Sequence, residues 1–316
     1  MRKIAHIINP VNAPAGSELA RVQPVTFASI RRAMQEAEGK VNVKFFTAQF
    51  AEDHPVVPSW AEKTPDLERS LMDFGTFGRT RKLPVLKDIL DRLYAASDAE
   101  YFVYSNADIC LMPSFYNVID AYASKGYDAF AINRRRITNR FTSPEELELM
   151  YAEAGEKHPG YDTLVFRRDL YPKFSLGNVC VGIPFFDTVL IHNFYAHAQQ
   201  FRLFTGKHLT FHLGMELIRQ WGDADHYRHN AKEYRAVRKE LYPLFRIENF
   251  PGANLPFFVR HFKWLFNPTF HYPTMLRLDF SQLGRKRRPR KKREVKGMRN
   301  RYFEFMSRHI NFDDEF

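Results

Sequence analysis

The chain has 316 residues, of which 45% are hydrophobic and 15% aromatic, which excludes intrinsic disorder and is ample for one large domain or two smaller ones. Residues 285–293 contribute +8 of the formal net charge of +11, which leaves +3 (11 − 8) elsewhere and disfavours nucleic-acid binding by the whole fold. No run of about 20 uncharged apolar residues and no secretory signal is visible, so we expect a cytoplasmic protein without a transmembrane helix. Cys110 and Cys180 are expected to be buried free thiols.

The first part of the chain alternates between predicted strands and helices. Residues 3–9 and 41–47 are apolar runs that predict strands, and apolar residues at helical spacing predict a helix over 24–38. Glu52 and Asp53 follow the second strand, where the residues alone indicate a solvated acidic loop.

A long segment over residues 55–81 has no clear periodicity, and such segments in α/β domains are often functional. Three cations at its end, Arg79, Arg81 and Lys82, precede a predicted helix over 84–94 that begins with proline. Free N–H groups and the helix dipole attract anions at a helix N-terminus. These cations therefore form either a cradle for a diphosphate or a basic surface turn.

The stretch from residue 100 to residue 136 is the centre of the prediction. An apolar run over 101–104 predicts a buried strand, and it ends abruptly in the polar cluster Ser105-Asn106-Ala107-Asp108. A helical pattern and a second apolar run over 128–133 follow, which together predict a βαβ unit. Such units place ligand-binding groups at the carboxyl ends of their strands, so Asp108 is expected at the rim of a parallel sheet.

Three polar residues follow later in the chain. Asp162 precedes a short predicted strand over 163–166, and Asp187 begins a predicted helix that ends near Phe204. His212 follows another short predicted strand. Considered one by one, these residues are also typical of a turn, a first helical turn and a histidine in the core.

Several other motifs are absent or weak. The sequence has no G-x-G-x-x-G after its first strand, no Walker A sequence and no G-x-S-x-G, which disfavours dinucleotide oxidoreductases, P-loop enzymes and typical serine hydrolases. His226 and His229 have H-x-x-H spacing, but they lie among charged residues and are interpreted as a solvated helix face.

The polar cluster resembles the D-x-D motif of glycosyltransferases with the GT-A fold. In that family the last aspartate helps to hold Mn²⁺ or Mg²⁺ against the diphosphate of a nucleotide-sugar donor. Asn106-Ala107-Asp108 looks like this motif with Asn in its first position, which removes one charge but keeps an oxygen ligand. The resemblance covers about residues 3–222. It implies an α/β, GT-A-like Rossmann-type fold, with a mostly parallel sheet flanked by helices and a C-terminal helical and aromatic-basic extension.

The resemblance also implies roles for other residues. Asp108, Asn106 and His212 would hold the metal, and Asp187 or Asp162 would be the catalytic base. The residues that would contact the donor nucleotide, besides Asn106 and Asp108, are Glu52, Asp53, Arg79, Arg81 and Lys82.

The composition changes from about residue 253. Aromatic and basic residues interleave over 257–280, and the basic run 285–293 follows. This pattern favours a peripheral site on an anionic membrane surface, at the inner face of the membrane, and a nucleic-acid arm is the less favoured alternative. We therefore predict three parts: a catalytic domain over 1–225, a helical and aromatic-rich extension over 226–284, and a basic tail over 285–316.

These observations predict a metal-dependent glycosyltransferase of the hexosyltransferase type, acting on a glycan or lipid-linked acceptor as in polysaccharide biosynthesis. A nucleotidyltransferase would use a similar site, but its Gly-rich, Lys-containing phosphate loop near the first strand is missing. A non-catalytic binding module tethered by its basic tail is a further alternative, and Asn106 in place of aspartate is its best support.

Overall fold

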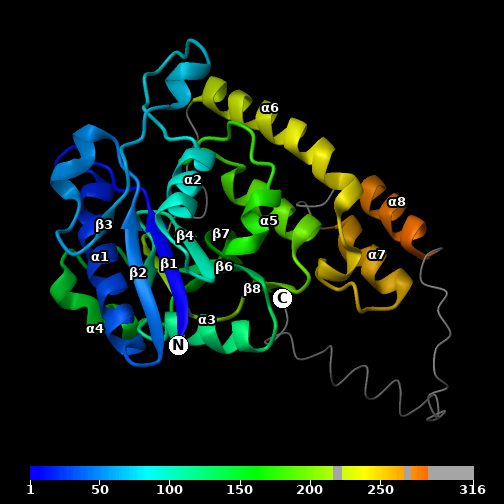
Figure 1. The fold of residues 1–316 in the computed structure, drawn as a ribbon, viewed down its shortest axis with the longest axis horizontal. Coiled ribbons are helices and arrows are strands. Elements are labelled where there is room, and N and C mark those ends of the chain that lie inside the picture. The colour runs from blue at the N-terminus through cyan, green and yellow to red at the C-terminus, as the bar shows by residue number, and fades with distance from the viewer. Residues whose placement is uncertain (216–222, 267–271, 284–316) are drawn as a thin grey trace. The chain divides into compact units, whose positions relative to one another are not determined.

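The computed structural model describes residues 1–215, 223–266 and 272–283 (Figure 1). The chain divides into two compact units, Met1–Asn249 and Phe250–Phe316. The predicted functional division at residues 225 and 285 stays a prediction, and the basic run 285–293 lies outside the described residues.

The first unit is built on a mixed sheet flanked by helices. Among the described residues the sheet has nine strands in the order β3-β2-β1-β4-β7-β6-β9-β5, with β8 paired to β6. The strands are β1 (Arg2–Ile8), β2 (Val41–Thr47), β3 (Glu62–Lys63), β4 (Tyr101–Ser105), β5 (Cys110–Leu111), β6 (Ala129–Ile137), β7 (Glu156–Arg167), β8 (Phe201–Phe204) and β9 (Thr210–Leu213). The helices are α1 (Glu18–Ala37), α2 (Leu86–Ala96), α3 (Phe115–Ser124), α4 (Leu147–Ala152), α5 (Phe186–His197) and α6 (Ala224–Leu241).

Five of the eight strand pairings within the described residues are parallel, which confirms the predicted α/β class with a mostly parallel sheet. The chain does pass from β4 through α3 to β6, as the βαβ pattern predicted. However, β7 lies between β4 and β6 and is antiparallel to both. The two strands are therefore second neighbours in the sheet, separated by an antiparallel strand.

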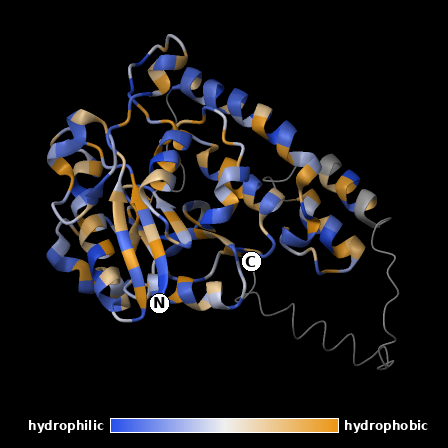
Figure 2. Cartoon of the chain, viewed as in Figure 1, coloured by the Kyte–Doolittle hydropathy of each residue, from blue (hydrophilic) through white to orange (hydrophobic). Residues whose placement is uncertain are grey.

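All five residues of β4 are buried, because helices cover both faces of the sheet. On one face, Phe27 and Ile30 of α1 and Phe115 of α3 pack against strand residues such as Phe130. Helices α2 and α5 lie on the other face (Figure 1). Figure 2 shows many of the hydrophobic residues on the central strands, which explains why the apolar runs predicted them well.

Three predicted boundaries were wrong. Helix α1 begins at Glu18, six residues before Pro24, because the Ser17 side chain accepts a hydrogen bond from the Ala20 N–H (3.2 Å) and caps the helix. The strand expected over 163–166 runs over all of β7, since it pairs with a neighbour on each side.

The third wrong boundary is the end of α5, which stops at His197 instead of near Phe204. The Asp128 carboxylate accepts hydrogen bonds from the N–H groups of Gln199 (2.8 Å) and Gln200 (2.9 Å). Those bonds turn the chain into β8, which pairs with β6. Asp128, which accepts the Gln199 N–H in place of a helical carbonyl oxygen, is 71 residues away in the sequence, so no local pattern predicts the end of the helix.

The described part of the second unit contains α7 (Phe257–Leu265) and α8 (Tyr272–Leu283). Arg260 of α7 donates hydrogen bonds from Nε and an NH₂ group to the two carboxylate oxygens of Asp279 on α8, each at 2.8 Å. His261 contacts the same carboxylate at 2.7 Å. An ionic cluster therefore joins the two helices.

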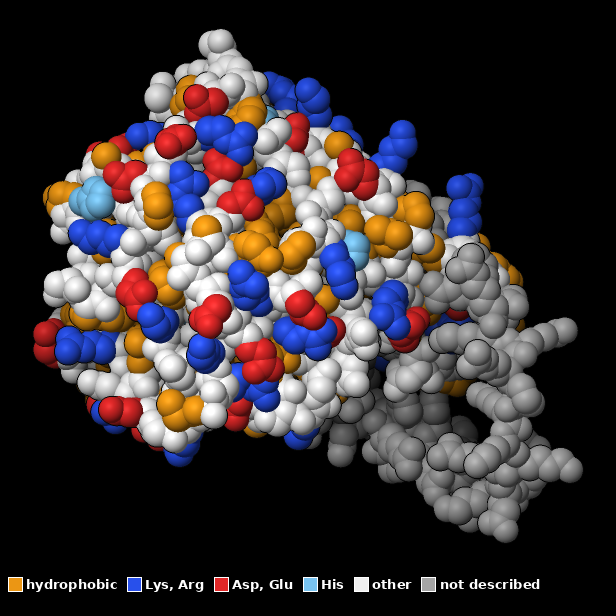
Figure 3. All heavy atoms as spheres, in the orientation of Figure 1, with side chains coloured by type: hydrophobic (Ala, Val, Ile, Leu, Met, Phe, Trp, Pro, Cys, Tyr) orange, Lys and Arg blue, Asp and Glu red, His pale blue; other side chains and the backbone are white. Residues whose placement is uncertain are grey.

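Two further sequence predictions can be compared with the structure. Cys110 and Cys180 are both free and buried, as predicted. Of the described helices, none combines the length and the apolar character needed to cross a membrane. On the face shown in Figure 3, Lys and Arg side chains are interspersed with Asp and Glu, which agrees with the low net charge outside residues 285–293.

Candidate active site

A cleft of about 1150 Å³ opens in the first unit where β1 and β4 end. Its lining comes from the loop after β4, the strands β6, β7 and β9, the start of α1, the loop before α2 and the turn before α5. The predicted site residues that line it are Asn106, Asp108, Asp162, Asp187, His212, Arg79, Arg81 and Lys82. Eight of the ten predicted residues thus lie around one cavity.

Asp108 and His212 lie together on one side of the cleft. The pairing of β5 with β9 explains this, because it places Cys110 opposite Phe211. Asp108 lies two residues before Cys110, and His212 directly follows Phe211. The Asp108 Oδ2 and His212 Nε2 atoms are 3.4 Å apart, and Glu18 Oε1 lies 3.7 Å from the same nitrogen. His212 is a residue of β9 and not of the loop after it.

This pair fits two neighbouring ligands of one cation. Two ligand atoms that are each about 2.1 Å from an ion lie roughly 3.0–3.4 Å apart when they occupy adjacent positions in its shell. The observed separation of 3.4 Å falls within this range. Within the described residues, no group of three or more His, Cys, Asp or Glu side chains is placed to hold a metal ion. A cation here would therefore need further ligands from a bound substrate or from water.

Asn106 connects the end of β4 to β7. Its Oδ1 accepts a hydrogen bond from the Tyr104 hydroxyl (3.1 Å), and its Nδ2 donates to Asp162 Oδ1 (3.2 Å). The amide is thus engaged on both ends with protein groups. Its predicted role as a metal ligand stays a prediction.

Asp162 lies in β7 and is buried, with an ion pair of 2.9 Å to Arg134 of β6. Burial raises the pKa of Asp162, and the nearby Arg134 charge opposes that rise. Sequence reasoning did not single out Arg134, because it begins a run of three arginines just after the predicted apolar run 128–133, and such a run gives no signal of a specific partner. The pair is a buried carboxylate with its own counter-charge.

Asp187 lies in the first turn of α5, and its Oδ1 accepts hydrogen bonds from the N–H (2.7 Å) and the hydroxyl (3.2 Å) of Thr188. Burial, followed by the charge of Asp162, raises the pKa of Asp187 to about 6. A carboxylate with this pKa is largely ionised at neutral pH and is still basic enough to take a proton. Of the two carboxylates on this side, Asp187 has the properties of a general base.

Phe185, immediately before α5, has a left-handed backbone with φ of 87°, and no other non-glycine residue in the described ranges has a positive φ. That conformation costs a bulky residue about 1–3 kcal/mol and persists only where the surroundings enforce it. The Phe185 ring stacks on Tyr234 at 5.0 Å between centroids and 11° between planes. This contact with α6 fixes the turn that presents Asp187, and no sequence pattern predicted it.

The first turn of α6 holds the basic loop before α2. Asp225 accepts a hydrogen bond from the Gly78 N–H (2.6 Å), and His226 Nε2 lies 2.9 Å from the Arg79 carbonyl oxygen. Asp223 pairs with Arg81 at 3.4 Å. The interpretation of His226 as part of a solvated helix face was wrong, because its side chain is buried against this loop.

The three cations of the loop differ in their partners. Arg81 is paired with Asp223, and Lys82 is paired with Glu52 at 2.6 Å. Within the part of the chain that the structure describes, the guanidinium of Arg79 forms no ion pair, and Arg79 is exposed. Arg79 is therefore the cation of this loop that is best placed to meet an anion in the cleft.

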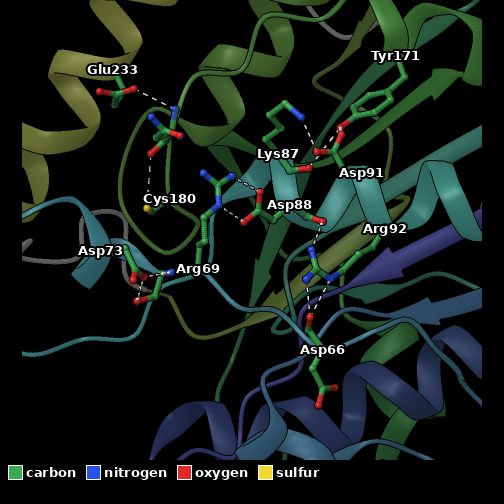
Figure 4. A network of polar contacts seen from close by, with 12 residues as sticks. Asp66, Arg69, Asp73, Lys87, Asp88, Asp91, Arg92, Tyr171, Cys180 and Glu233 are labelled. Carbon is green, nitrogen blue, oxygen red and sulfur yellow. Dashed lines mark hydrogen bonds and ion pairs between the residues drawn. The ribbon is translucent and has the colours of Figure 1, made fainter.

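Behind the loop, a polar network fixes the preceding segment to α2 (Figure 4). Arg69 and Asp88 point toward one another and share two hydrogen bonds, of 3.0 and 2.5 Å. Arg92 donates to the Asp66 carbonyl oxygen, and the Tyr171 hydroxyl donates to Asp91 at 2.6 Å. The segment that sequence analysis left unassigned is therefore held to α2 by hydrogen bonds of Arg69 and Arg92.

Glu52 and Asp53 lie beside the cleft and do not line it. Asp53 is buried and accepts hydrogen bonds from the Asn12 N–H (2.7 Å) and the Phe50 N–H (3.3 Å). The hydrogen bond with Lys82 holds the pKa of Glu52 below its usual range. Their expected contact with a nucleotide stays a prediction.

No family model matches the chain, and no curated protein matches it. Among solved structures it is similar to S. aureus TarS 1-349 in complex with UDP-GlcNAc, with 11% identity and a TM-score of 0.46, over 82% of this chain and 69% of that one. It is also similar to glucosyl-3-phosphoglycerate synthase from Mycobacterium tuberculosis in complex with Mn²⁺, UDP-glucose and phosphoglyceric acid. That match has 15% identity and a TM-score of 0.42, over 76% of this chain and 79% of that one. These likenesses concern the path of the chain, so the function is argued from the residues of the site.

Proposed function

We propose that the protein is a glycosyltransferase that moves a sugar from a nucleotide-sugar donor to a hydroxyl group of a glycan or lipid-linked acceptor, with a divalent cation. One observation carries this proposal. A single cleft joins a carboxylate–histidine pair with metal-ligand spacing, a loop with three cations, and a carboxylate with a pKa raised to about 6.

Asp108 and His212 would hold Mn²⁺ or Mg²⁺, and oxygen atoms of the donor diphosphate would complete the coordination. When bound, the cation would neutralise negative charge on the departing diphosphate. Arg79 would add a second positive charge from the opposite loop. The remaining negative charge of the donor would be met by Arg81 and Lys82 after partial release from Asp223 and Glu52.

Asp187 would act as the general base. Its carboxylate accepts the proton of the acceptor hydroxyl while that oxygen bonds to the anomeric carbon, and the bond from this carbon to the diphosphate oxygen breaks. Asp162 is less suited to this role, because Arg134 and Asn106 occupy its carboxylate. Asp162 would instead position Asn106 and, through its charge, raise the pKa of Asp187.

Isothermal titration of the full chain with UDP, GDP, ADP and CDP, with and without Mn²⁺, tests the proposal. We expect one nucleoside diphosphate to bind at least tenfold more tightly with the cation present. Binding of a nucleoside triphosphate with release of pyrophosphate would indicate a nucleotidyltransferase. Binding of a sugar nucleotide without turnover, in the presence of a panel of saccharide acceptors, would favour a non-catalytic module. Failure of every nucleotide to bind would refute all three.

A further inference from the structure

The second unit contains a helix whose polarity is reversed relative to a normal surface helix. On α7, Arg260, His261 and Trp264 face α8 and the preceding loop, and His261 and Trp264 are only 5% and 1% exposed. The opposite face is apolar and open to solvent, with exposed fractions of 84% for Phe258, 67% for Phe262, 53% for Leu265 and 68% for Phe266. These four residues have the spacing i, i+4, i+7 and i+8, so they share one side of the helix.

The buried ionic cluster fixes this orientation. Arg260 forms two hydrogen bonds with Asp279 of α8, His261 contacts the same carboxylate at 2.7 Å, and Trp264 donates from Nε1 to the Pro251 carbonyl oxygen at 2.8 Å. Rotating α7 to bury its phenylalanines would expose Trp264 and break these bonds. The apolar side chains are therefore held in solvent by specific contacts of the opposite face.

The exposed apolar surface extends onto α8. Phe280 is 57% exposed and its ring lies 5.6 Å from that of Phe257, beside Phe258. Figure 2 shows the hydrophobic residues along α7. Single exposed apolar residues are common on protein surfaces, but a contiguous patch of large ones marks a binding surface. We call Phe258, Phe262, Leu265, Phe266 and Phe280 the phenylalanine face.

Charge identifies the kind of surface that the phenylalanine face meets. In the described part of the second unit the only acidic residue is Asp279, which is buried and paired with Arg260, whereas Lys263 and Arg277 add positive charge. In the sequence, two residues after α8, the run 285–293 adds eight cations. An anionic bilayer would satisfy both features at once, since its headgroups attract the cations and its acyl boundary accepts the rings.

We propose that the phenylalanine face is a membrane-docking surface that lies in the interface of an anionic bilayer. Helix α7 is nine residues long, about 14 Å, which is too short to span a bilayer and suits a position in its plane. The rings would enter the headgroup region, and the cations of the unit and of residues 285–293 would remain at the lipid phosphates. This proposal does not depend on the proposed function.

The test is binding of the full chain to vesicles of phosphatidylcholine with about one third phosphatidylglycerol, compared with phosphatidylcholine alone. We expect the intact protein to sediment with the anionic vesicles. The double variant Phe258→Ser, Phe262→Ser should bind at least about tenfold more weakly, a difference of about 1.4 kcal/mol. The matched control is Leu149→Ser, Leu244→Ser, which removes two exposed apolar side chains from the first unit and should bind like the parent.

Ionic strength separates the two contributions. Raising the salt concentration, or deleting residues 285–316, should remove the electrostatic part and leave binding that still depends on Phe258 and Phe262. Circular dichroism and nucleoside-diphosphate binding should be unchanged in both double variants, which distinguishes a docking defect from a folding or active-site defect.

Three results would overturn the proposal. The first is equal vesicle binding by the phenylalanine-face variant and its parent. The second is a change in oligomeric state of that variant in the absence of vesicles, which would assign the face to contact between copies of the chain. The third is binding of the intact protein to RNA or DNA without binding to anionic vesicles, which would assign the basic run to nucleic acid.

Discussion

The two sides of the cleft use carboxylates in opposite ways. On the side that we call the metal side, Asp108 lies 3.4 Å from His212 in a loop after a strand. On the base side, Asp162 is buried, and both Asp162 and Asp187 have raised pKa values. The difference teaches that residue type alone does not assign a role, because the environment gives one aspartate ligand-like geometry with a histidine and gives the other two raised pKa values.

The strongest test of this difference is Asp187→Asn, which removes the base and keeps the shape of the side chain. We expect transfer to fall by a factor of roughly 10² to 10⁴, the usual contribution of general base catalysis, with donor binding unchanged. Transfer rates and titration of the donor nucleotide measure the two effects. If Asp162→Asn causes this loss and Asp187→Asn does not, the roles of the two carboxylates are exchanged. Full activity of both variants would show that neither is the base.

The metal side is tested by Asp108→Ala. Mutation of a residue that only hydrogen-bonds to a metal ligand typically weakens metal binding by roughly 10- to 100-fold. Loss of a ligand itself should cost more, so we expect nucleotide binding in the presence of Mn²⁺ to weaken by more than this factor. Calorimetric titration with and without the cation measures this change. Asp98→Ala is the matched control, because Asp98 is an exposed aspartate that forms an ion pair with Lys3 at the surface. Normal Mn²⁺-dependent binding by Asp108→Ala would remove the metal side from the proposal.

The raised pKa on the base side predicts a pH-dependent gain in stability from Asp187→Asn. Above about pH 6 the wild-type carboxylate is ionised in both the folded and the unfolded states, and the folded state disfavours its charge. The variant should therefore unfold less readily at pH 7.5, by at most about 3 kcal/mol, and the gain should shrink as the pH falls below about 6 and vanish below about pH 3, where the carboxyl is protonated in both states. Urea unfolding at the two pH values measures it.

The control for this prediction has the opposite sign. The hydrogen bond with Arg167 lowers the pKa of Asp169, so Asp169→Asn should destabilise the protein slightly at pH 7.5 and not at low pH. The same titration of Asp187 predicts that transfer declines as the pH falls through about 6. A rate that stays constant between pH 5 and pH 8 would contradict the assignment of Asp187.

The smallest effect is expected at Asn106, which follows β4 on the metal side and hydrogen-bonds to Asp162 on the base side. Asn106→Asp restores the second carboxylate of a D-x-D motif and should tighten cation binding several-fold. It also replaces the hydrogen bond between Asn106 and Asp162 with repulsion between two carboxylates, which should raise the pKa of Asp162 further and lower the melting temperature. Titration with Mn²⁺ and thermal unfolding measure both. A variant with unchanged cation affinity would mean that residue 106 only joins β4 to β7.

Local sequence determined a large part of this protein. The buried strands were predicted because their residues are apolar on both sides, and Asp108 was placed correctly because a strand must end where the polar cluster begins. Eight of the ten predicted site residues line one cleft, but the convergence of carboxyl ends of parallel strands accounts only for Asn106 and Asp108, which follow β4. The two exceptions, Glu52 and Asp53, follow β2, which lies farther along the sheet.

Tertiary structure alone decided the rest. Only the pairing of β5 with β9 brings His212 to Asp108, and only the insertion of β7 between β4 and β6 sets Asp162 against Arg134 and Asn106. The strained turn at Phe185 and the hold of α6 on the basic loop depend on contacts between segments far apart in the chain. Periodicity and turn residues report how a segment folds locally. Which segments meet is set by packing of the whole sheet and its helices, and no local pattern records that.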